Sequence, residues 1–172
     1  KKMVMDDTQS IINAYKSGEL NFISADYTVM DEYKDSDGLI TSPSQTSYYV
    51  LFNVNEAPFD DVRVRQAFSM AVNRDEVASA CGSSYEASDF FVAKHLKSSA
   101  SGKDWAEEAE EDPIGFDPDK AKELLAEAGY PDGEGFPAIT YKYPSLQLDS
   151  DMAQALQAQW KTNLGIEVAV SY

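Results

Sequence analysis

The chain has 172 residues, a length that suits one domain or one large lobe, and 43% of them are hydrophobic, which is enough to build a core. Its 30 Asp and Glu residues outnumber 14 Lys and Arg residues, and the resulting charge of −16 argues against nucleic acid as a partner because phosphate would be repelled. The apolar runs are only a few residues long, whereas a membrane-spanning helix needs about 20 residues.

The first forty residues predict short elements separated by turns. Asp7 can cap a helix that Gly18 ends. Residues 20–24 (LNFIS) are typical of a short strand, and residues 28–34 of a helical turn. The run DSDG at 35–38 then predicts a tight turn.

Residues 47–54 (SYYVLFNV) are the strongest strand candidate, because they are rich in aromatic and β-branched side chains. Their nearly continuous apolar character indicates cover on both faces. A helix follows, with Asp60 or Asp61 as its N-cap. Its apolar residues recur at helical spacing and form one stripe: Val64, Ala67, Phe68, Ala71 and Val72.

The chain then becomes polar and acidic. Residues 98–113 are predicted to be an acidic surface excursion, since a contiguous run of carboxylates is usually solvated. Pro118 suits the first turn of a further helix, which Gly129 ends. The glycine-rich run that follows Gly129 comes after a helix and not before one, so it predicts tight turns rather than a phosphate cradle.

The last part of the chain predicts a βαβ unit. Residues 139–143 and 166–172 alternate apolar and polar side chains, as strands do. Between them lies a helix with an apolar face at i+4 spacing, made by Met152, Leu156, Trp160 and Leu164. Strand, helix and strand of these lengths favour parallel pairing, so the fold class is α/β, with a mixed sheet and flanking helices. The strand pattern runs to Tyr172, which leads us to expect part of a larger protein.

No motif indicates catalysis, a cofactor or a metal. Cys81 and His95 could form a thiol–imidazole pair, which leaves a thiol enzyme as an alternative, but no third orienting residue or oxyanion-hole motif accompanies them. One histidine and one cysteine cannot supply a typical zinc site. A calcium loop around DSDG would place Tyr33 and Ser44 where acidic ligands are required. We therefore expect no catalytic residue, no metal and no cofactor.

Several segments, in order, resemble one family. Residues 47–53 (SYYVLFN) and 57–74 (APFDDVRVRQAFSMAVNR) look like a signature of the oligopeptide/dipeptide-binding proteins of ABC importers, which are extracytoplasmic solute-binding proteins of family 5. Residues 116–130 (FDPDKAKELLAEAGY) resemble a later helix of that family, and residues 159–168 (QWKTNLGIEV) its closing stretch. The early residues 15–22 (YKSGELNF) fit as well.

The resemblance implies one partial lobe, residues 1–172, of a two-lobe periplasmic-binding-protein type II fold. It implies a monomeric binding protein that captures peptides in the periplasm, or as a surface lipoprotein, and passes them to an ABC permease in the membrane. Relatives on the same scaffold bind nickel or sugars, and an adhesin or signalling receptor stays open as well.

The resemblance also assigns roles to individual residues. Tyr48 and Tyr49 are the ligand-binding candidates, because aromatic residues on the matching strand of relatives can face the cleft. Arg63 and Arg65 are expected to form structural ion pairs. The segment 81–112 departs from the family, since it is polar and acidic where many relatives have a short proline-containing stretch.

Overall fold

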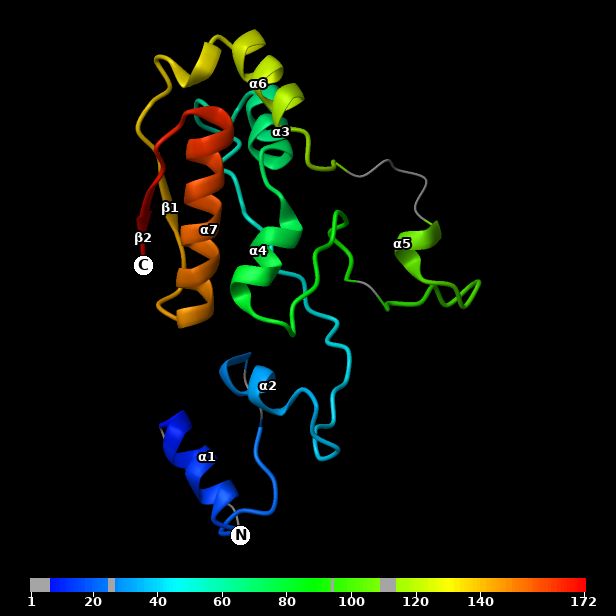
Figure 1. Cartoon of the computed structure of the whole chain (residues 1–172). Coiled ribbons are helices and arrows are strands. Elements are labelled where there is room, and N and C mark those ends of the chain that lie inside the picture. Colours follow the sequence, from blue (N-terminus) through cyan, green and yellow to red (C-terminus); the bar gives the residue numbers. More distant parts are fainter. Residues whose placement is uncertain (1–6, 25–26, 94, 109–113) are drawn as a thin grey trace. The chain divides into compact units, whose positions relative to one another are not determined.

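The computed structural model describes residues 7–24, 27–93, 95–108 and 114–172. The chain divides into two compact units, Lys1–Leu39 and Ile40–Tyr172. The first is small and helical, and the second contains both strands and the larger core (Figure 1). None of the helices in the described part of the chain has the length and apolar character required to cross a bilayer.

The first unit is built from α1 (Thr8–Lys16) and α2 (Tyr27–Tyr33). The predicted cap of α1 is confirmed: the Asp7 carboxylate accepts a hydrogen bond from the Ser10 amide at 2.8 Å. Gly18 has φ +80° just after the helix, as its sequence position predicts. The prediction of a strand at 20–24 is wrong. The Leu20 amide donates to the Ala14 carbonyl oxygen of α1, so the start of this segment caps the helix end and does not pair with a strand.

The second unit begins with helices α3 (Val62–Met70) and α4 (Arg74–Cys81). The apolar stripe predicted around α3 is confirmed, since all five of its residues are buried. It spans a break, however, because Asn73 caps a new helix by accepting from the Glu76 amide at 3.3 Å. The Asn73 side-chain amide also donates to the Glu76 carboxylate at 3.2 Å, and the Asn73 backbone amide donates to the Gln159 side-chain oxygen of α7 at 2.6 Å.

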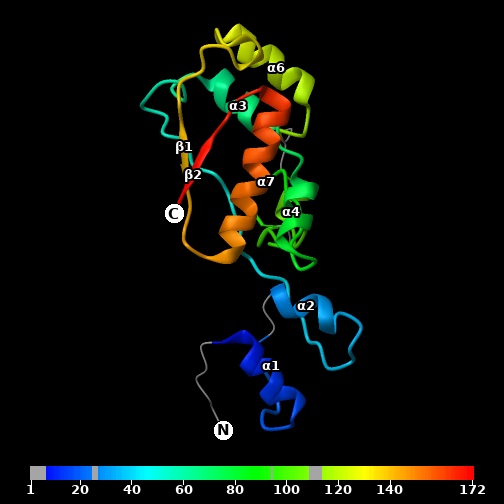
Figure 2. The same cartoon turned by 60° about the vertical axis from the view of Figure 1, so that its left-hand side comes forward.

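The βαβ unit is confirmed. It consists of β1 (Thr140–Lys142), α7 (Gln147–Leu164) and β2 (Ala169–Ser171), and the strands pair in parallel with Tyr141 opposite Val170. Within the described residues the sheet has these two strands. Helix α7 lies between this sheet on one side and α3 and α4 on the other (Figures 1 and 2). The α/β class is therefore confirmed.

Helix α6 (Pro118–Glu127) begins as predicted, with Asp117 accepting from the Lys120 amide at 2.9 Å. A short 3-10 turn, η1 (Pro131–Gly133), follows it. This turn meets the end of α7 backbone to backbone: a Cβ added at Gly133 would lie 2.8 Å from the Leu164 carbonyl oxygen. Only glycine fits so close an approach, which explains part of the glycine-rich run after α6.

The segment 98–113 is described up to Glu108. It contains the short helix α5 (Trp105–Glu108), and its Asp104 forms an antiparallel bridge with Lys97, which lies just before the segment. Residues 109–113, which hold most of the acidic run, lie outside the described residues. The prediction of an acidic excursion at 98–113 therefore stays a prediction.

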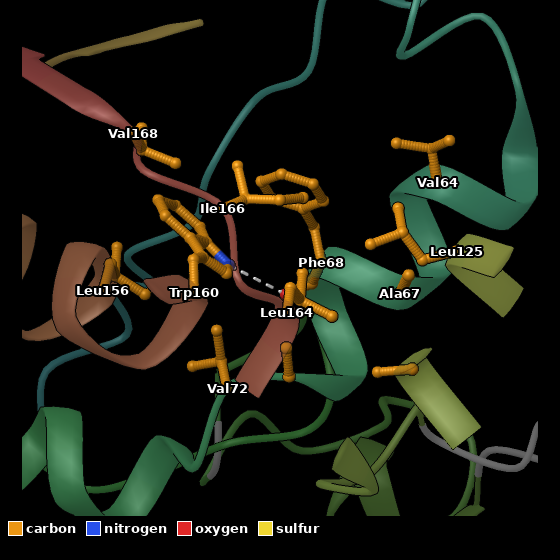
Figure 3. Close-up of a cluster of buried hydrophobic side chains, with 12 residues drawn as sticks. Val64, Ala67, Phe68, Val72, Leu125, Leu156, Trp160, Leu164, Ile166 and Val168 are labelled. Carbon is orange, nitrogen blue, oxygen red and sulfur yellow. Dashed lines mark hydrogen bonds between the residues drawn. The ribbon is translucent and has the colours of Figure 1, made fainter. Parts of the chain in front are cut away.

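The core of the second unit gathers around Phe68 (Figure 3). Trp160 of α7 packs against the Phe68 ring with centroids 5.4 Å apart, and Phe59, Phe52 and Phe136 contact the same ring. Side chains of α7 also reach the break after α3, where the Asn163 amide donates to the Ala71 carbonyl oxygen at 2.8 Å. These contacts hold α3 and α7 together, and through Phe52 they fix the segment that carries Tyr48 and Tyr49.

Candidate functional site: an exposed aromatic patch

Four aromatic side chains from two segments form what we call the aromatic patch: Tyr48, Tyr49, Tyr85 and Phe91. Tyr48 meets Tyr85 edge to face with ring centroids 6.0 Å apart, and Tyr49 meets Phe91 at 4.8 Å. Tyr48, Tyr49 and Phe91 are 53%, 56% and 69% exposed, so the pairs lie on the surface and not in the core. Large aromatic area that stays in contact with water is typical of a binding surface.

The segment 47–54 is not the doubly covered strand that its composition predicts. It has no strand assignment, and its residues alternate: Val50 and Phe52 are half-buried, while Leu51 is 81% exposed. Phe52 stacks on Phe59 with centroids 4.8 Å apart, which fixes the inner face of the segment. A doubly covered strand needs another strand to pair with its backbone and another element to cover its outer face. The apolar composition of 47–54 does not show where such partners lie.

Arg74 holds the second segment of the patch. It lies at the start of α4 and forms a salt bridge of 3.4 Å with Asp89, two residues before Phe91. The same guanidinium donates to the Ser69 hydroxyl at 2.9 Å and to the Val72 carbonyl oxygen at 3.4 Å, so it is anchored on α3 and on the turn after it. Neither Tyr85 nor Phe91 was predicted from the sequence, although aromatic residues stand out in the polar stretch that contains them.

The aromatic patch offers a ligand apolar ring surfaces and the polar hydroxyl groups of its tyrosines. The rings can stack on flat or aliphatic groups, and the tyrosine hydroxyls can donate or accept hydrogen bonds. Such a surface suits a ligand with mixed apolar and amide character. The ligand roles of Tyr48 and Tyr49 stay a prediction, now with defined neighbours.

Cys81 and His95 have environments that do not suit a thiol–imidazole pair. Cys81 is 1% exposed, and burial, followed by the charges of Asp151 and Asp149, raises the pKa of its thiol. A reactive cysteine needs the opposite shift, because the thiolate is the nucleophile. His95 is exposed, and its backbone amide donates to the Asp104 carboxylate at 2.8 Å.

Arg63 has the structural role that was predicted. Its Nε lies 3.1 Å from both carboxylate oxygens of Asp61, and its Nη1 donates to the Glu127 carbonyl oxygen at 2.8 Å. Arg65 differs from the prediction of an ion pair, because its guanidinium donates to the carbonyl oxygens of Phe59 and Asp60 at 2.7 and 3.1 Å. Both arginines thus fix the entry to α3.

The DSDG run forms a turn, as predicted, in which the Gly38 amide donates to the Ser36 hydroxyl at 3.2 Å. Among the described residues, no three His, Cys, Asp or Glu side chains lie together where they could hold a metal ion.

The fold defines the class of protein. Solved structures of oligopeptide-binding proteins share it. One is OppAIV of Borrelia burgdorferi, described as a periplasmic oligopeptide-binding protein. The chain superposes on it with a TM-score of 0.70 and 28% identity, over 98% of this chain and 32% of OppAIV. Listeria monocytogenes OppA bound to peptide gives a TM-score of 0.78 at 15% identity, over 98% of this chain and 34% of that one, which shows the fold alone. This is the periplasmic-binding-protein type II fold.

The family follows from the sequence profile. The chain belongs to the bacterial extracellular solute-binding proteins, family 5, whose middle-region profile matches residues 2–172. The dipeptide-binding protein DppE of Bacillus subtilis is 28% identical over 172 residues, which is 99% of this chain and 32% of DppE. The heme-binding protein A of Haemophilus influenzae is 34% identical over 116 residues, which is 65% of this chain and 20% of that protein. The chain thus spans about a third or less of the relatives it matches, and these relatives are named as binding proteins.

Proposed function

We propose that this chain is part of the substrate-binding component of an ABC importer, which captures peptides outside the cytoplasmic membrane and delivers them to a membrane permease. The observation that carries the proposal is the match of the family profile to residues 2–172. Two similar proteins, DppE and the Borrelia protein, are named for dipeptides and oligopeptides. Peptides are therefore the ligand class that we assign.

In this proposal Tyr48 and Tyr49 contact the peptide. Both rings are more than half exposed, and each is held against a second aromatic ring, Tyr85 or Phe91. A ring fixed in this way loses little conformational entropy when a ligand packs on it, which favours binding. Their hydroxyls can serve the amide groups of any peptide, so contact would not depend on one side chain.

Residues 1–172 belong to one lobe in this proposal, with 98–113 as an acidic excursion on its surface. Closure of two lobes around the peptide would favour the bound state by differential affinity. The whole protein would act as a monomer in the periplasm or as a lipid-anchored surface protein. It would bind and release its ligand without chemical turnover.

The test uses the full-length protein. Native mass spectrometry of protein purified from its host should reveal a bound peptide, and calorimetry should then give its affinity. Tyr49→Ala should weaken that affinity about tenfold, since a well-placed aromatic contact is worth about 1 kcal/mol or more beyond its buried area. Phe116→Ala removes another partly exposed ring of the same unit and should leave the affinity unchanged. A full-length protein that binds nickel or a sugar and no peptide would overturn the proposal.

A further inference from the structure

A glutamine of α7 holds the point where α3 ends and α4 begins. The Gln159 side-chain oxygen accepts a hydrogen bond of 2.6 Å from the Asn73 backbone amide, and its side-chain nitrogen donates to the Asn73 carbonyl oxygen at 3.2 Å. The same nitrogen donates to the Glu76 carboxylate, also at 3.2 Å. Because one side chain binds both backbone groups of Asn73, Gln159 fixes the orientation of this residue as well as its position.

Asn73 determines where α4 starts. It is the N-cap, with the extended backbone angles φ −76° and ψ 101°, and its carbonyl oxygen accepts the first hydrogen bond of the helix from the Val77 amide at 3.2 Å. Asn163, four residues after Gln159 and thus on the same face of α7, donates to the Ala71 carbonyl oxygen. Side chains of α7 therefore hold the chain on both sides of the break, where α4 and α7 lie side by side (Figures 1 and 2).

The residue after this N-cap reaches the aromatic patch. Arg74 is the first residue of α4, and its guanidinium lies 3.4 Å from the Asp89 carboxylate. Two residues later, Phe91 packs on the Tyr49 ring with centroids 4.8 Å apart. How the guanidinium meets Asp89 depends on the backbone position of Arg74, which follows directly on the residue that Gln159 holds. Direct contacts thus lead from Gln159 to a ring of the proposed ligand site.

We propose that Gln159 is a positioning residue for ligand binding, which acts on the aromatic patch without touching the ligand. It sets the start of α4, and Arg74 and Asp89 pass this restraint on to the segment of Phe91. A ligand then packs on a ring pair that is already ordered, whereas without Gln159 part of the binding free energy is used to order Phe91. The inference rests on the proposed peptide-binding function, in which Tyr49 contacts the peptide.

The chain offers a matched control on the same helix. Gln157 is half-buried like Gln159, and its side-chain nitrogen donates to the Val168 carbonyl oxygen at 2.6 Å, just before β2. Gln157 thus binds α7 to the sheet side of the unit, and Gln159 binds it to α4. Methionine is close to glutamine in size but has no donor and only a weak acceptor, so Gln159→Met and Gln157→Met remove hydrogen bonds while keeping the packing.

The first measurement is hydrogen exchange in the full-length protein. Gln159→Met should raise the exchange of the backbone amides around Phe91 about three- to tenfold, because the Arg74–Asp89 pair then restrains this segment less. Gln157→Met should leave that exchange within about twofold of the wild type. A melting temperature that falls in both variants, with faster exchange around Phe91 in Gln159→Met alone, separates positioning from general stability.

The second measurement is the affinity for a defined peptide, Ala-Phe-Ala, by calorimetry. Its ring and amide groups suit the aromatic patch. Gln159→Met should weaken binding about three- to tenfold, and Gln157→Met should change it by less than about twofold. Asp89→Asn should weaken binding too, but in a Gln159→Met background it should add little, because the two substitutions break one link. In a Gln157→Met background it should keep its full effect.

The outcomes distinguish the two proposals. If the wild-type protein binds neither Ala-Phe-Ala nor any other peptide tried, the peptide-binding function is wrong, and the role of Gln159 in it is wrong too. If peptides bind but Gln159→Met leaves the exchange around Phe91 or the affinity unchanged, the positioning role is wrong while peptide binding stands. The same conclusion follows if the effects of Gln159→Met and Asp89→Asn on affinity add in full, since Gln159 would then act by another route.

Discussion

The indole N–H of Trp160 donates a hydrogen bond of 3.0 Å to the carbonyl oxygen of Phe68, a residue 92 positions earlier in the chain (Figure 3). Both side chains are buried. The bond joins α7 to the last turns of α3, where the carbonyl would otherwise be close to the helix end. It thus gives a buried polar group a partner in the centre of an apolar cluster.

Trp160→Phe tests this contact. The substitution keeps an aromatic ring but removes the donor and some volume, so it leaves the Phe68 carbonyl oxygen without this partner and a small cavity beside it. We expect the full-length protein to lose about 2–4 kcal/mol of unfolding free energy, from the unpaired group and the cavity together. Trp105→Phe, at a 43% exposed position, is the matched control and should change stability by less than about 0.5 kcal/mol. Equal losses from the two substitutions, measured by urea denaturation, would contradict the assignment.

Gly165 is required for two reasons that can be separated. Its φ is +72°, and a Cβ added there would lie 2.6 Å from the Asp132 carbonyl oxygen. Gly135 has nearly the same φ, +74°, with nothing within 4 Å of an added Cβ. Gly135→Ala should therefore cost about 1–2 kcal/mol for the left-handed backbone alone. Gly165→Ala should cost about 1–3 kcal/mol more, because η1 must also move away from the end of α7.

Thermal denaturation of the two glycine variants gives the comparison directly. The melting temperature of Gly165→Ala should lie clearly below that of Gly135→Ala. Identical melting temperatures would mean that the close approach of η1 and α7 adjusts without strain. In that case the positive φ of Gly165 alone would explain the destabilisation, without a clash between the added Cβ and Asp132.

The helices of this protein were largely predictable because their signals are local. Asp7 caps the helix that it was predicted to start, α6 begins at Pro118 as predicted, and the stripe from Val64 to Val72 is buried. The one missed helix of the core, α4, carries a local signal too, since Asn73 and Glu76 have the spacing of a capping box. That signal was overlooked because the apolar stripe continues across the break between α3 and α4.

The structure of segment 47–54 and the contacts of the aromatic patch could not be predicted from the sequence, because both depend on residues far away in the chain. A strand depends on a partner that can lie anywhere, so the composition of 47–54 could not establish its pairing. The contacts of Tyr48 with Tyr85 and of Tyr49 with Phe91 are equally non-local. The family resemblance suggested that Tyr48 and Tyr49 face a cleft, whereas their neighbours depend on how Arg74 fixes a second segment.

Asp61 should make stability depend on pH in acid. Its hydrogen bonds with Arg63 hold the pKa of this carboxyl below its ordinary value of 3.8. A carboxyl whose pKa is lower in the folded state than in the unfolded state stabilises the protein fully at pH values above the unfolded-state pKa. This stabilisation is lost as the pH falls through the folded-state pKa. The difference in melting temperature between the wild type and Asp61→Asn should therefore be constant near neutral pH and shrink below about pH 4. A difference that stays the same down to pH 2 would contradict the role of Asp61.

Cys81 should be inert in the folded protein. Its side chain is buried and the pKa of its thiol is raised, so the thiolate is scarce and sheltered. Alkylation by iodoacetamide at pH 7.5, followed by mass spectrometry of the fragment that contains Cys81, should be slow before and rapid after the addition of denaturant. Cys81→Ala should leave ligand binding unchanged. Rapid alkylation of the folded protein would revive the thiol-enzyme alternative.

Arg74 should control the order of the aromatic patch through Asp89. Arg74→Gln removes the salt bridge and weakens the anchor on Ser69, and the segment that carries Phe91 should then exchange its amide hydrogens faster. Asp89→Asn breaks the same pair from the other side and should reproduce the effect, whereas Lys120→Gln disrupts a surface pair of α6 and should not. If Tyr49 binds ligand as proposed, both variants at the Arg74–Asp89 pair should also weaken binding, because Phe91 no longer fixes the Tyr49 ring. Faster exchange around Phe91 with unchanged affinity would place the ligand contact elsewhere than on the Tyr49–Phe91 pair.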